Sequence, residues 1–202
     1  MSYDGYSAIA EVYDKLNKDI DYAAWADMIE ECFSRFGKEK PEILLDLACG
    51  SGSMSEEMAK LGYDVVAVDN SPSMLTAAME KKYESGLPIQ YLCQDMRELD
   101  MFGTMDITIC TLDSLNHLPS LEDVQRVFAR VSLFAMPGGL FLFDMNTIYK
   151  HHAILNGQTY VYDTDTVFCV WENHLREGTN IVDMQLTFFE QEDGVYYRSE
   201  EQ

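Results

Sequence analysis

One stretch of nine residues constrains the fold more than any other, Leu44-Leu45-Asp46-Leu47-Ala48-Cys49-Gly50-Ser51-Gly52. Its first half is almost continuously apolar, as in parallel strands that helices cover on both faces. Two glycines one residue apart follow, and a helical pattern then begins. Glycine permits positive φ and lets a ligand approach the backbone with no Cβ in the way, and the first N–H groups of the helix point into the same space. The stretch therefore predicts a strand, a turn and a helix that together bind a nucleotide-like ligand.

An acidic residue at the end of a second apolar run supports this interpretation. Residues 65–68 read as another buried strand, and Asp69 follows Gly50 by 19 residues. The dinucleotide-binding fingerprint has an acid that binds ribose about 20 residues after its glycines, and a carboxylate can accept hydrogen bonds from two hydroxyls at once. The third glycine of that fingerprint would fall at position 55, where this chain has Ser55. A nicotinamide-dependent oxidoreductase therefore remains only an alternative.

Three motifs in order resemble those of the class I S-adenosylmethionine-dependent methyltransferases. They are Leu45-Asp46-Leu47-Ala48-Cys49-Gly50-Ser51-Gly52, then Val68-Asp69 followed by Ser71-Pro72-Ser73-Met74-Leu75, then Gln94-Asp95-Met96. The resemblance covers about residues 3–145. It implies a Rossmann-like methyltransferase fold and S-adenosyl-L-methionine as the cofactor, but it does not specify the acceptor. A cofactor-binding protein without catalytic activity is a second alternative, because the motifs do not exclude it.

The resemblance assigns different parts of the cofactor to the glycines and the acids. Gly50 and Gly52 would let the backbone approach the methionyl part. Asp46 would lie near the amino group of the cofactor, or its side chain would only stabilise the turn. Asp69 would bind the ribose hydroxyls, or it would cap the next helix.

The remaining cofactor residues come from the third motif and from the N-terminal segment. Asp95 would accept a hydrogen bond from the adenine amine beside the backbone of Met96, or it would lie in a surface loop. Tyr13 belongs to an aromatic segment that in this family often closes over the cofactor, and simple packing is the alternative. The complete predicted cofactor set is Tyr13, Asp46, Ala48, Gly50, Gly52, Asp69, Asn70, Asp95, Met96 and Leu112.

Candidates for acceptor binding follow the fourth predicted strand and recur near the C-terminus. The stretch 110–117 lacks the prolines that nucleic-acid amino methyltransferases have there. Asn116 and His117 would face the acceptor, and His117 is a candidate general base because imidazole exchanges protons near neutral pH; a structural histidine is the alternative. Tyr160 and Trp171 would line an aromatic acceptor pocket, or they would pack within a β layer. No metal site is predicted, since the adjacent His151 and His152 should diverge.

The hydrophobic pattern predicts a doubly wound, mostly parallel α/β sheet. Alternating strands and helices give this fold with right-handed crossovers, and we expect a cofactor-binding domain over residues 1–148. From residue 149 helical periodicity disappears, and residues 149–202 predict an antiparallel β appendage or lid. The expected parallel strands are 43–47, 64–68, 89–93, 105–111 and 140–143, with a turn at 137–139 before the last. The expected antiparallel strands are 159–162, 166–172, 181–189 and 195–198, with a hairpin turn at Asp193-Gly194.

The fifth predicted strand would be an open edge. Methyltransferases of this class usually have seven core strands, in the order 3-2-1-4-5-7-6, and we find five before the appendage. Either the chain is shortened or appendage strands replace the missing pair. An uncovered apolar edge promotes association. We therefore expect residues 140–143 to be covered by residues 181–189 of the same chain or by a second copy in a homodimer.

Composition narrows the function further. The formal net charge of −21 opposes nucleic-acid binding, which depends on lysine and arginine neutralising phosphates, and Lys81-Lys82 reads as a surface pair. These features favour a small-molecule acceptor. The sequence has no run of about 18 apolar residues, the length that would indicate a membrane span. The first residues do not resemble a signal peptide. The five cysteines are scattered, and Cys32, Cys49, Cys93 and Cys110 are expected to lie in buried elements, which is typical of a reducing cytoplasm.

Overall fold

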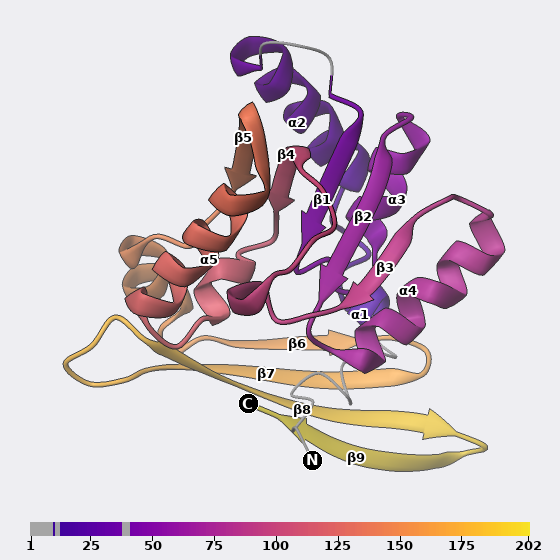
Figure 1. Ribbon diagram of the computed structural model, residues 1–202. Helices are drawn as coiled ribbons and strands as arrows, with labels where there is room; N and C mark the ends of the chain where they lie inside the picture. The colour runs from indigo at the N-terminus through magenta and orange to yellow at the C-terminus, as the bar shows by residue number, and fades with distance from the viewer. Residues whose placement is uncertain (1–9, 11–12, 38–40) are drawn as a thin grey trace. The chain divides into compact units, whose positions relative to one another are not determined.

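The computed structural model describes residue 10, residues 13–37 and residues 41–202. These residues form two compact units (Figure 1). One unit consists of residues 20–145. The other consists of residues 146–202 together with the described residues before 20.

The larger unit is built on a five-stranded parallel sheet, as the sequence predicts. The strands lie in the order β3-β2-β1-β4-β5, and every neighbouring pair is parallel. The order reverses between β1 and β4, so the chain winds outward in both directions from that point. The strands are β1 (Ile43–Leu47), β2 (Asp64–Asp69), β3 (Gln90–Cys93), β4 (Met105–Cys110) and β5 (Ala135–Phe143).

Helices cover both faces of this sheet, and the central strands are therefore apolar on both sides. On β1, Leu44 packs in one buried cluster with Ala26 and Ile29 of α2 and with Met54 and Met58 of α3. Leu45 and Leu47 belong to a second cluster, which contains Val127 and Val131 of α5. The helices of this unit are α2 (Tyr22–Phe36), α3 (Ser53–Lys60), α4 (Pro72–Ser85), η1 (Met96–Glu98), η2 (Ser114–His117) and α5 (Leu121–Phe134).

Side-chain caps fix where three helices begin. Asp21 accepts a hydrogen bond from the N–H of Ala24, and Ser71 accepts one from that of Met74. Ser120 accepts one from the N–H of Asp123. Serine and aspartate are favoured at such positions because their side-chain oxygens satisfy N–H groups that the helix leaves open.

The smaller unit contains a separate antiparallel sheet in the order β6-β7-β8-β9. The predicted turn at Asp193-Gly194 joins β8 to β9, and both residues have positive φ, 49° and 80°, as a two-residue hairpin requires. The same unit holds α1 (Tyr13–Leu16), whose Leu16 packs on a buried cluster of the sheet. The strands are β6 (Thr159–Asp163), β7 (Val167–Leu175), β8 (Val182–Glu192) and β9 (Val195–Glu201).

Three local expectations were wrong. β5 begins at Ala135 rather than after the predicted turn, and its pairing with β4 jumps from Ala135 to Leu140. A Cβ at Gly139 would lie 2.7 Å from the carbonyl oxygen of Asp106, so the glycine allows the irregular strand to stay against β4. Helical structure also continues beyond residue 149, as a short π-helix, η3 (Lys150–Leu155). Finally, Cys93 is exposed rather than buried.

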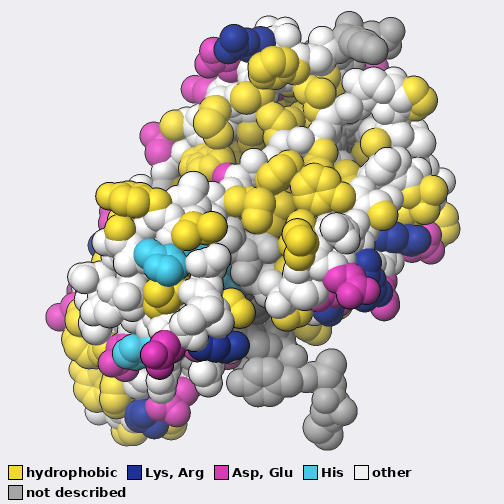
Figure 2. All heavy atoms as spheres, turned by 90° about the vertical axis from the view of Figure 1, so that its left-hand side faces the viewer, with side chains coloured by type: hydrophobic (Ala, Val, Ile, Leu, Met, Phe, Trp, Pro, Cys, Tyr) yellow, Lys and Arg dark blue, Asp and Glu magenta, His cyan; other side chains and the backbone are white. Residues whose placement is uncertain are grey.

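The expectation that residues 181–189 of the same chain cover the edge strand β5 was also wrong. β8 pairs with β7 and β9, not with β5. Figure 2, which views the side of Figure 1 where α5 and β5 lie, shows hydrophobic side chains gathered across this face. On α5 and β5, Phe128, Phe141 and Phe143 form an aromatic group with ring centroids 5.1–5.3 Å apart, and Phe128 and Phe143 are partly exposed. Pairing with a second copy stays a prediction. Among the described residues, no helix is long and apolar enough to cross a membrane.

Candidate functional site

The predicted cofactor residues of the larger unit follow neighbouring strands at one edge of the parallel sheet. The carboxyl ends of β3, β2, β1 and β4 are consecutive along that edge, as Figure 1 shows. The glycine-rich turn follows β1, and residues 111–117 follow β4. These two segments flank the point where the strand order reverses, which is where ligands bind in open α/β sheets.

Left-handed backbone conformations define the turn after β1. Ala48, Gly50 and Gly52 have φ values of 61°, 54° and 78°. The N–H of Gly52 donates to the carbonyl of Cys49 at 2.9 Å, which closes the turn before α3 begins. A Cβ on Gly52 would overlap the hydroxyl oxygen of Tyr91 and lie 3.2 Å from the Cβ of Ala78. Glycine is therefore needed at position 52 for two reasons: Tyr91 and Ala78 leave no room for a Cβ, and the φ angle is positive.

Asp69 joins the ends of β1 and β2. Its Oδ2 accepts a hydrogen bond of 2.8 Å from the N–H of Gly50, and its Oδ1 accepts one of 2.8 Å from the N–H of Ser71. The carboxylate thus orients the glycine turn and the start of α4 together. The next residue, Asn70, is exposed.

Asp46 is almost completely buried, with 1% of its surface exposed. Its Oδ2 accepts a hydrogen bond of 2.5 Å from the hydroxyl of Ser55 on α3. Burial raises the pKa of Asp46 to about 7, while the bond from Ser55 lowers it and the charge of Asp69 raises it. Ser55, which sequence reasoning used only to argue against a dinucleotide fingerprint, is thus the partner of the buried acid.

The third motif forms a local ion pair. Asp95 caps η1, and its carboxylate accepts hydrogen bonds from the backbone and the guanidinium of Arg97, the closest at 2.5 Å. The hydrogen bond from the Arg97 side chain is the main reason that the pKa of Asp95 is lowered. Met96 packs against the buried cluster on the α5 side of the sheet.

The segment after β4 also has strained backbone. Leu112 and Asp113 have φ values of 58° and 51°, in the left-handed region that costs a non-glycine residue about 1–2 kcal/mol. Asp144, directly after β5, accepts a hydrogen bond of 2.9 Å from the N–H of Asp113 and so holds this conformation. The η2 helix that follows places Asn116 half-buried and His117 exposed. Sequence reasoning missed Asp144, although an acid directly after an apolar strand was a visible signal.

Each parallel strand contributes one aspartate near this edge, so the edge is strongly acidic. Asp46 is in β1 and Asp69 ends β2, while Asp95, Asp113 and Asp144 follow β3, β4 and β5. A negative edge suits a ligand that carries positive charge, because the charges attract at short range.

The remaining predicted residues belong to the smaller unit. Tyr13 begins α1, and Tyr160 faces Trp171 across β6 and β7 with ring centroids 5.8 Å apart. The expectation that His151 and His152 diverge was wrong, since both rings reach Asn180, each at 2.9 Å. Among the described residues, no group of three or more His, Cys, Asp or Glu side chains could hold a metal ion.

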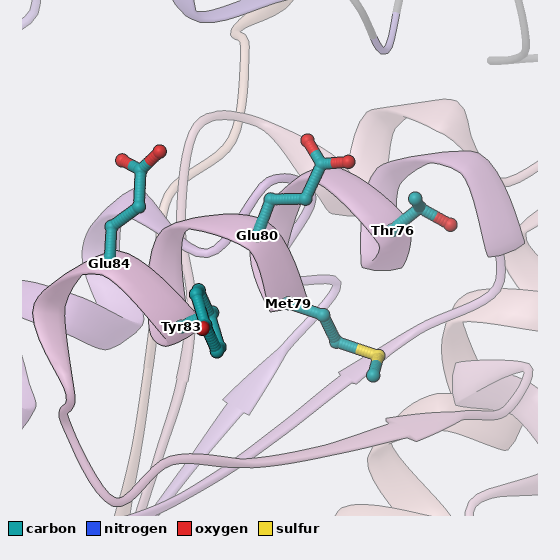
Figure 3. Close-up of a pocket in the computed structure, with 5 residues that line it drawn as sticks. All are labelled: Thr76, Met79, Glu80, Tyr83 and Glu84. Atoms are coloured by element: carbon teal, nitrogen blue, oxygen red, sulfur yellow. The ribbon is translucent and has the colours of Figure 1, made fainter.

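A hollow on the outer side of α4 is a separate feature (Figure 3). It is lined by Thr76, Met79, Glu80, Tyr83 and Glu84. Tyr83 is 90% exposed and Met79 is 59% exposed. None of the predicted site residues lines this hollow, and it is a surface depression of one helix.

Comparisons with known proteins identify the class. The model of a family described as "Methyltransferase domain" matches residues 44–139. A methyltransferase-family protein of Geobacillus sp. (strain WCH70) is 30% identical over 97% of this chain, which covers 80% of that protein. The crystal structure of an S-adenosylmethionine-dependent methyltransferase from Clostridium acetobutylicum is 35% identical, with a TM-score of 0.83 over 97% of this chain and 79% of its own.

A more distant structure shares the fold. It is an amino pentose methyltransferase from Micromonospora echinaspora with S-adenosylmethionine bound, 18% identical, with a TM-score of 0.75 over 94% of this chain and 79% of its own. The chain has a Rossmann-like sheet, and its acid-lined glycine turn is the candidate site for a nucleotide-type cofactor. The chain belongs to the S-adenosylmethionine-dependent methyltransferases. The residues of the candidate site fit that cofactor, since Gly50 and Gly52 have no Cβ to obstruct an approach to the backbone, and the acidic edge suits a sulfonium and an ammonium group.

The contact between Gly52 and Tyr91 gives a first prediction. Gly52→Ala should destabilise the protein by about 2 kcal/mol or more, through positive φ and overlap with the tyrosine hydroxyl. Adding Tyr91→Phe removes the overlapping oxygen, so the double variant should recover part of the loss, whereas Tyr91→Phe alone should change stability by less than about 1 kcal/mol. Chemical denaturation of the three variants measures this. Strictly additive effects would show that the two residues do not meet.

The buried acid gives a pH prediction. The pKa of Asp46 is higher in the folded protein, about 7, than in the unfolded chain. Its contribution to stability is therefore full below about pH 4 and is lost as the pH rises through about 7. Asp46→Asn should gain stability relative to the parent between pH 5 and pH 8, by at most about 4 kcal/mol. Thermal unfolding without cofactor measures the stability difference between Asp46→Asn and the parent. If that difference does not change with pH, the pKa of Asp46 is not raised. Ser55→Ala should lower stability at pH 8.

Proposed function

We propose that this methyltransferase transfers the methyl group to a small-molecule acceptor by in-line displacement at the acidic edge of the parallel sheet. The observation that carries the proposal is the bond between Gly50 and Asp69. It joins the glycine turn to the acid at the end of the neighbouring strand. This arrangement supports a ligand whose ribose binds the acid while its methionyl chain lies against the turn.

When bound, S-adenosylmethionine supplies a methyl carbon activated by its sulfonium. An acceptor lone pair would displace the thioether sulfur from that carbon in line, and the proton that the acceptor loses would pass to a base such as His117. The protein mainly orients the two reactants and excludes water. Orientation alone can contribute about 7–11 kcal/mol, so few dedicated catalytic side chains are needed.

The predicted residues take the following parts in cofactor binding. Gly50 and Gly52, with Ala48, present backbone to the methionyl part, and Asp46 attracts its ammonium group. Asp69 accepts hydrogen bonds from the ribose hydroxyls. The remaining predicted contacts of the larger unit, to adenine and to the body of the cofactor, come from Asn70, Asp95, Met96 and Leu112. The contact of Tyr13, which belongs to the smaller unit, stays a prediction.

The acceptor candidates come from the segment after β4 and from the antiparallel sheet. Asn116 and His117 are the polar candidates of η2, and the exposed His117 would take up the proton. Tyr160 and Trp171 would hold an aromatic or ring-shaped acceptor. The Nε1 of Trp171 and the Oδ1 of Asn173 are buried and have no hydrogen-bond partner among the described residues. Both residues lie on the same face of β7, which supports a polar ligand there.

The charge of the chain supports a small acceptor. The net charge of −21 opposes binding to DNA or RNA. The Micromonospora enzyme is an amino pentose methyltransferase. At 18% identity it shows only that the two proteins share a fold. The five cysteines, all free thiols, support a reducing compartment, the cytoplasm.

Binding and turnover test the proposal together. S-adenosylhomocysteine should raise the Tm in a concentration-dependent way, by an amount equivalent to about 2.7 kcal/mol at 100 times the Kd, and NAD and NADP should not. Asp69→Ala should weaken binding about tenfold or more, because it removes charge-assisted hydrogen bonds.

Turnover then separates an enzyme from a protein that only binds the cofactor. Release of S-adenosylhomocysteine should exceed the acceptor-free rate with at least one member of a panel of phenols, catechols, amines and amino sugars. Methyl transfer only to RNA, DNA or protein substrates would contradict the small-molecule assignment. Cofactor binding without transfer to any acceptor would favour the non-catalytic alternative.

A further inference from the structure

A lysine on α4 reaches the glycine-rich turn from behind. The Nζ of Lys81 donates hydrogen bonds to the hydroxyl of Ser51 at 3.1 Å and to that of Ser53 at 2.8 Å. Ser51 lies between the two left-handed glycines and is 1% exposed, and Ser53 is the first residue of α3. One ammonium group therefore ties the middle of the turn to the start of the helix. The sequence predicts Lys81-Lys82 as a surface pair; both lysines are half-buried, and Lys81 binds the turn.

The charges around the turn explain why a cation lies there. Burial is the main cause that raises the pKa of Cys49, and the charges of Asp46 and Asp69 raise it further, whereas the charge of Lys81 lowers it. All three charged groups thus act on the same turn. The ammonium offsets part of the repulsion between the two carboxylates, and its three donors can serve both serines.

We propose that Lys81 is a positioning residue for the methyl donor, which holds the turn of residues 49–53 in its binding conformation without touching the cofactor. A turn with several left-handed residues has many competing conformations when it is unrestrained, and fixing each backbone residue costs conformational entropy. Contacts made before binding remove that cost from the binding step. The inference concerns the cofactor site alone and does not depend on the acceptor.

Calorimetric titration with S-adenosylhomocysteine tests the role of Lys81. Lys81→Met keeps the length of the side chain and removes its charge and donors, and it should weaken binding about tenfold. Lys81→Arg keeps a charge and donors and should restore the affinity to within about threefold of the parent. Lys82→Met is the matched control from the next position of the same helix, and it should bind as the parent does.

A double-mutant cycle separates positioning from general stabilisation. In a Ser51→Ala/Ser53→Ala background, Lys81→Met should weaken binding by less than about twofold, because the contacts it removes are already lost. If Lys81→Met lowers the Tm but leaves the affinity for S-adenosylhomocysteine unchanged well below the Tm, the lysine only stabilises the fold and the proposal is overturned.

Ser53→Ala provides the test if Lys81→Met does not fold. It removes the shorter of the two contacts and should weaken binding about threefold or more, and parental affinity in that variant would overturn the proposal. If the parent protein binds S-adenosylhomocysteine and Lys81→Met binds it with the same affinity, only the role of Lys81 is overturned. The proposed methyltransferase function then still stands.

Discussion

The carboxylate of Asp69 is the constraint on which the site depends. It accepts hydrogen bonds from Gly50 and Ser71, so one side chain fixes the turn after β1, the end of β2 and the beginning of α4. A carboxylate offers about four acceptor directions, and two backbone partners therefore do not exclude ribose hydroxyls. The spacing of 19 residues between Gly50 and Asp69 makes this arrangement visible in the sequence. It is the length of one helix and one strand, which separate the two adjacent strand ends.

Much of the fold could be predicted from local patterns. The buried parallel strands are apolar runs, and the helices begin at Asp21, Ser71 and Ser120, whose side chains cap them. These signals are contained in neighbouring residues. The early start of β5 was missed because Pro137-Gly138-Gly139 favours a turn, whereas the structure keeps these residues in an irregular strand against β4.

The site was predicted less completely, since its key contacts join distant residues. Ser55 lies nine residues after Asp46 and binds it across a helix start. Lys81 lies 30 residues after Ser51 and read as a surface lysine. Asp144 restrains the strained Asp113 from another strand. Local sequence patterns do not specify such pairs, because they depend on how the strand ends come together.

Preorganisation connects these contacts with the chemistry. Asp69 and Lys81 hold the glycine turn, and Asp144 holds the segment after β4, so the backbone on both sides of the strand-order reversal is fixed before a ligand arrives. The same edge carries aspartates from all five parallel strands, which suits a cationic methyl donor. Methyl transfer needs orientation more than reactive side chains, and a restrained acidic edge supplies orientation.

A crystal structure of the protein with S-adenosylhomocysteine tests the central claim most directly. The account predicts that the ribose hydroxyls lie within hydrogen-bonding distance of the Asp69 carboxylate and that the homocysteine part lies against the backbone of Gly50 and Gly52. It also predicts that the sulfur faces the segment after β4. A ligand bound elsewhere, with Asp69 contacting only Gly50 and Ser71, would contradict it.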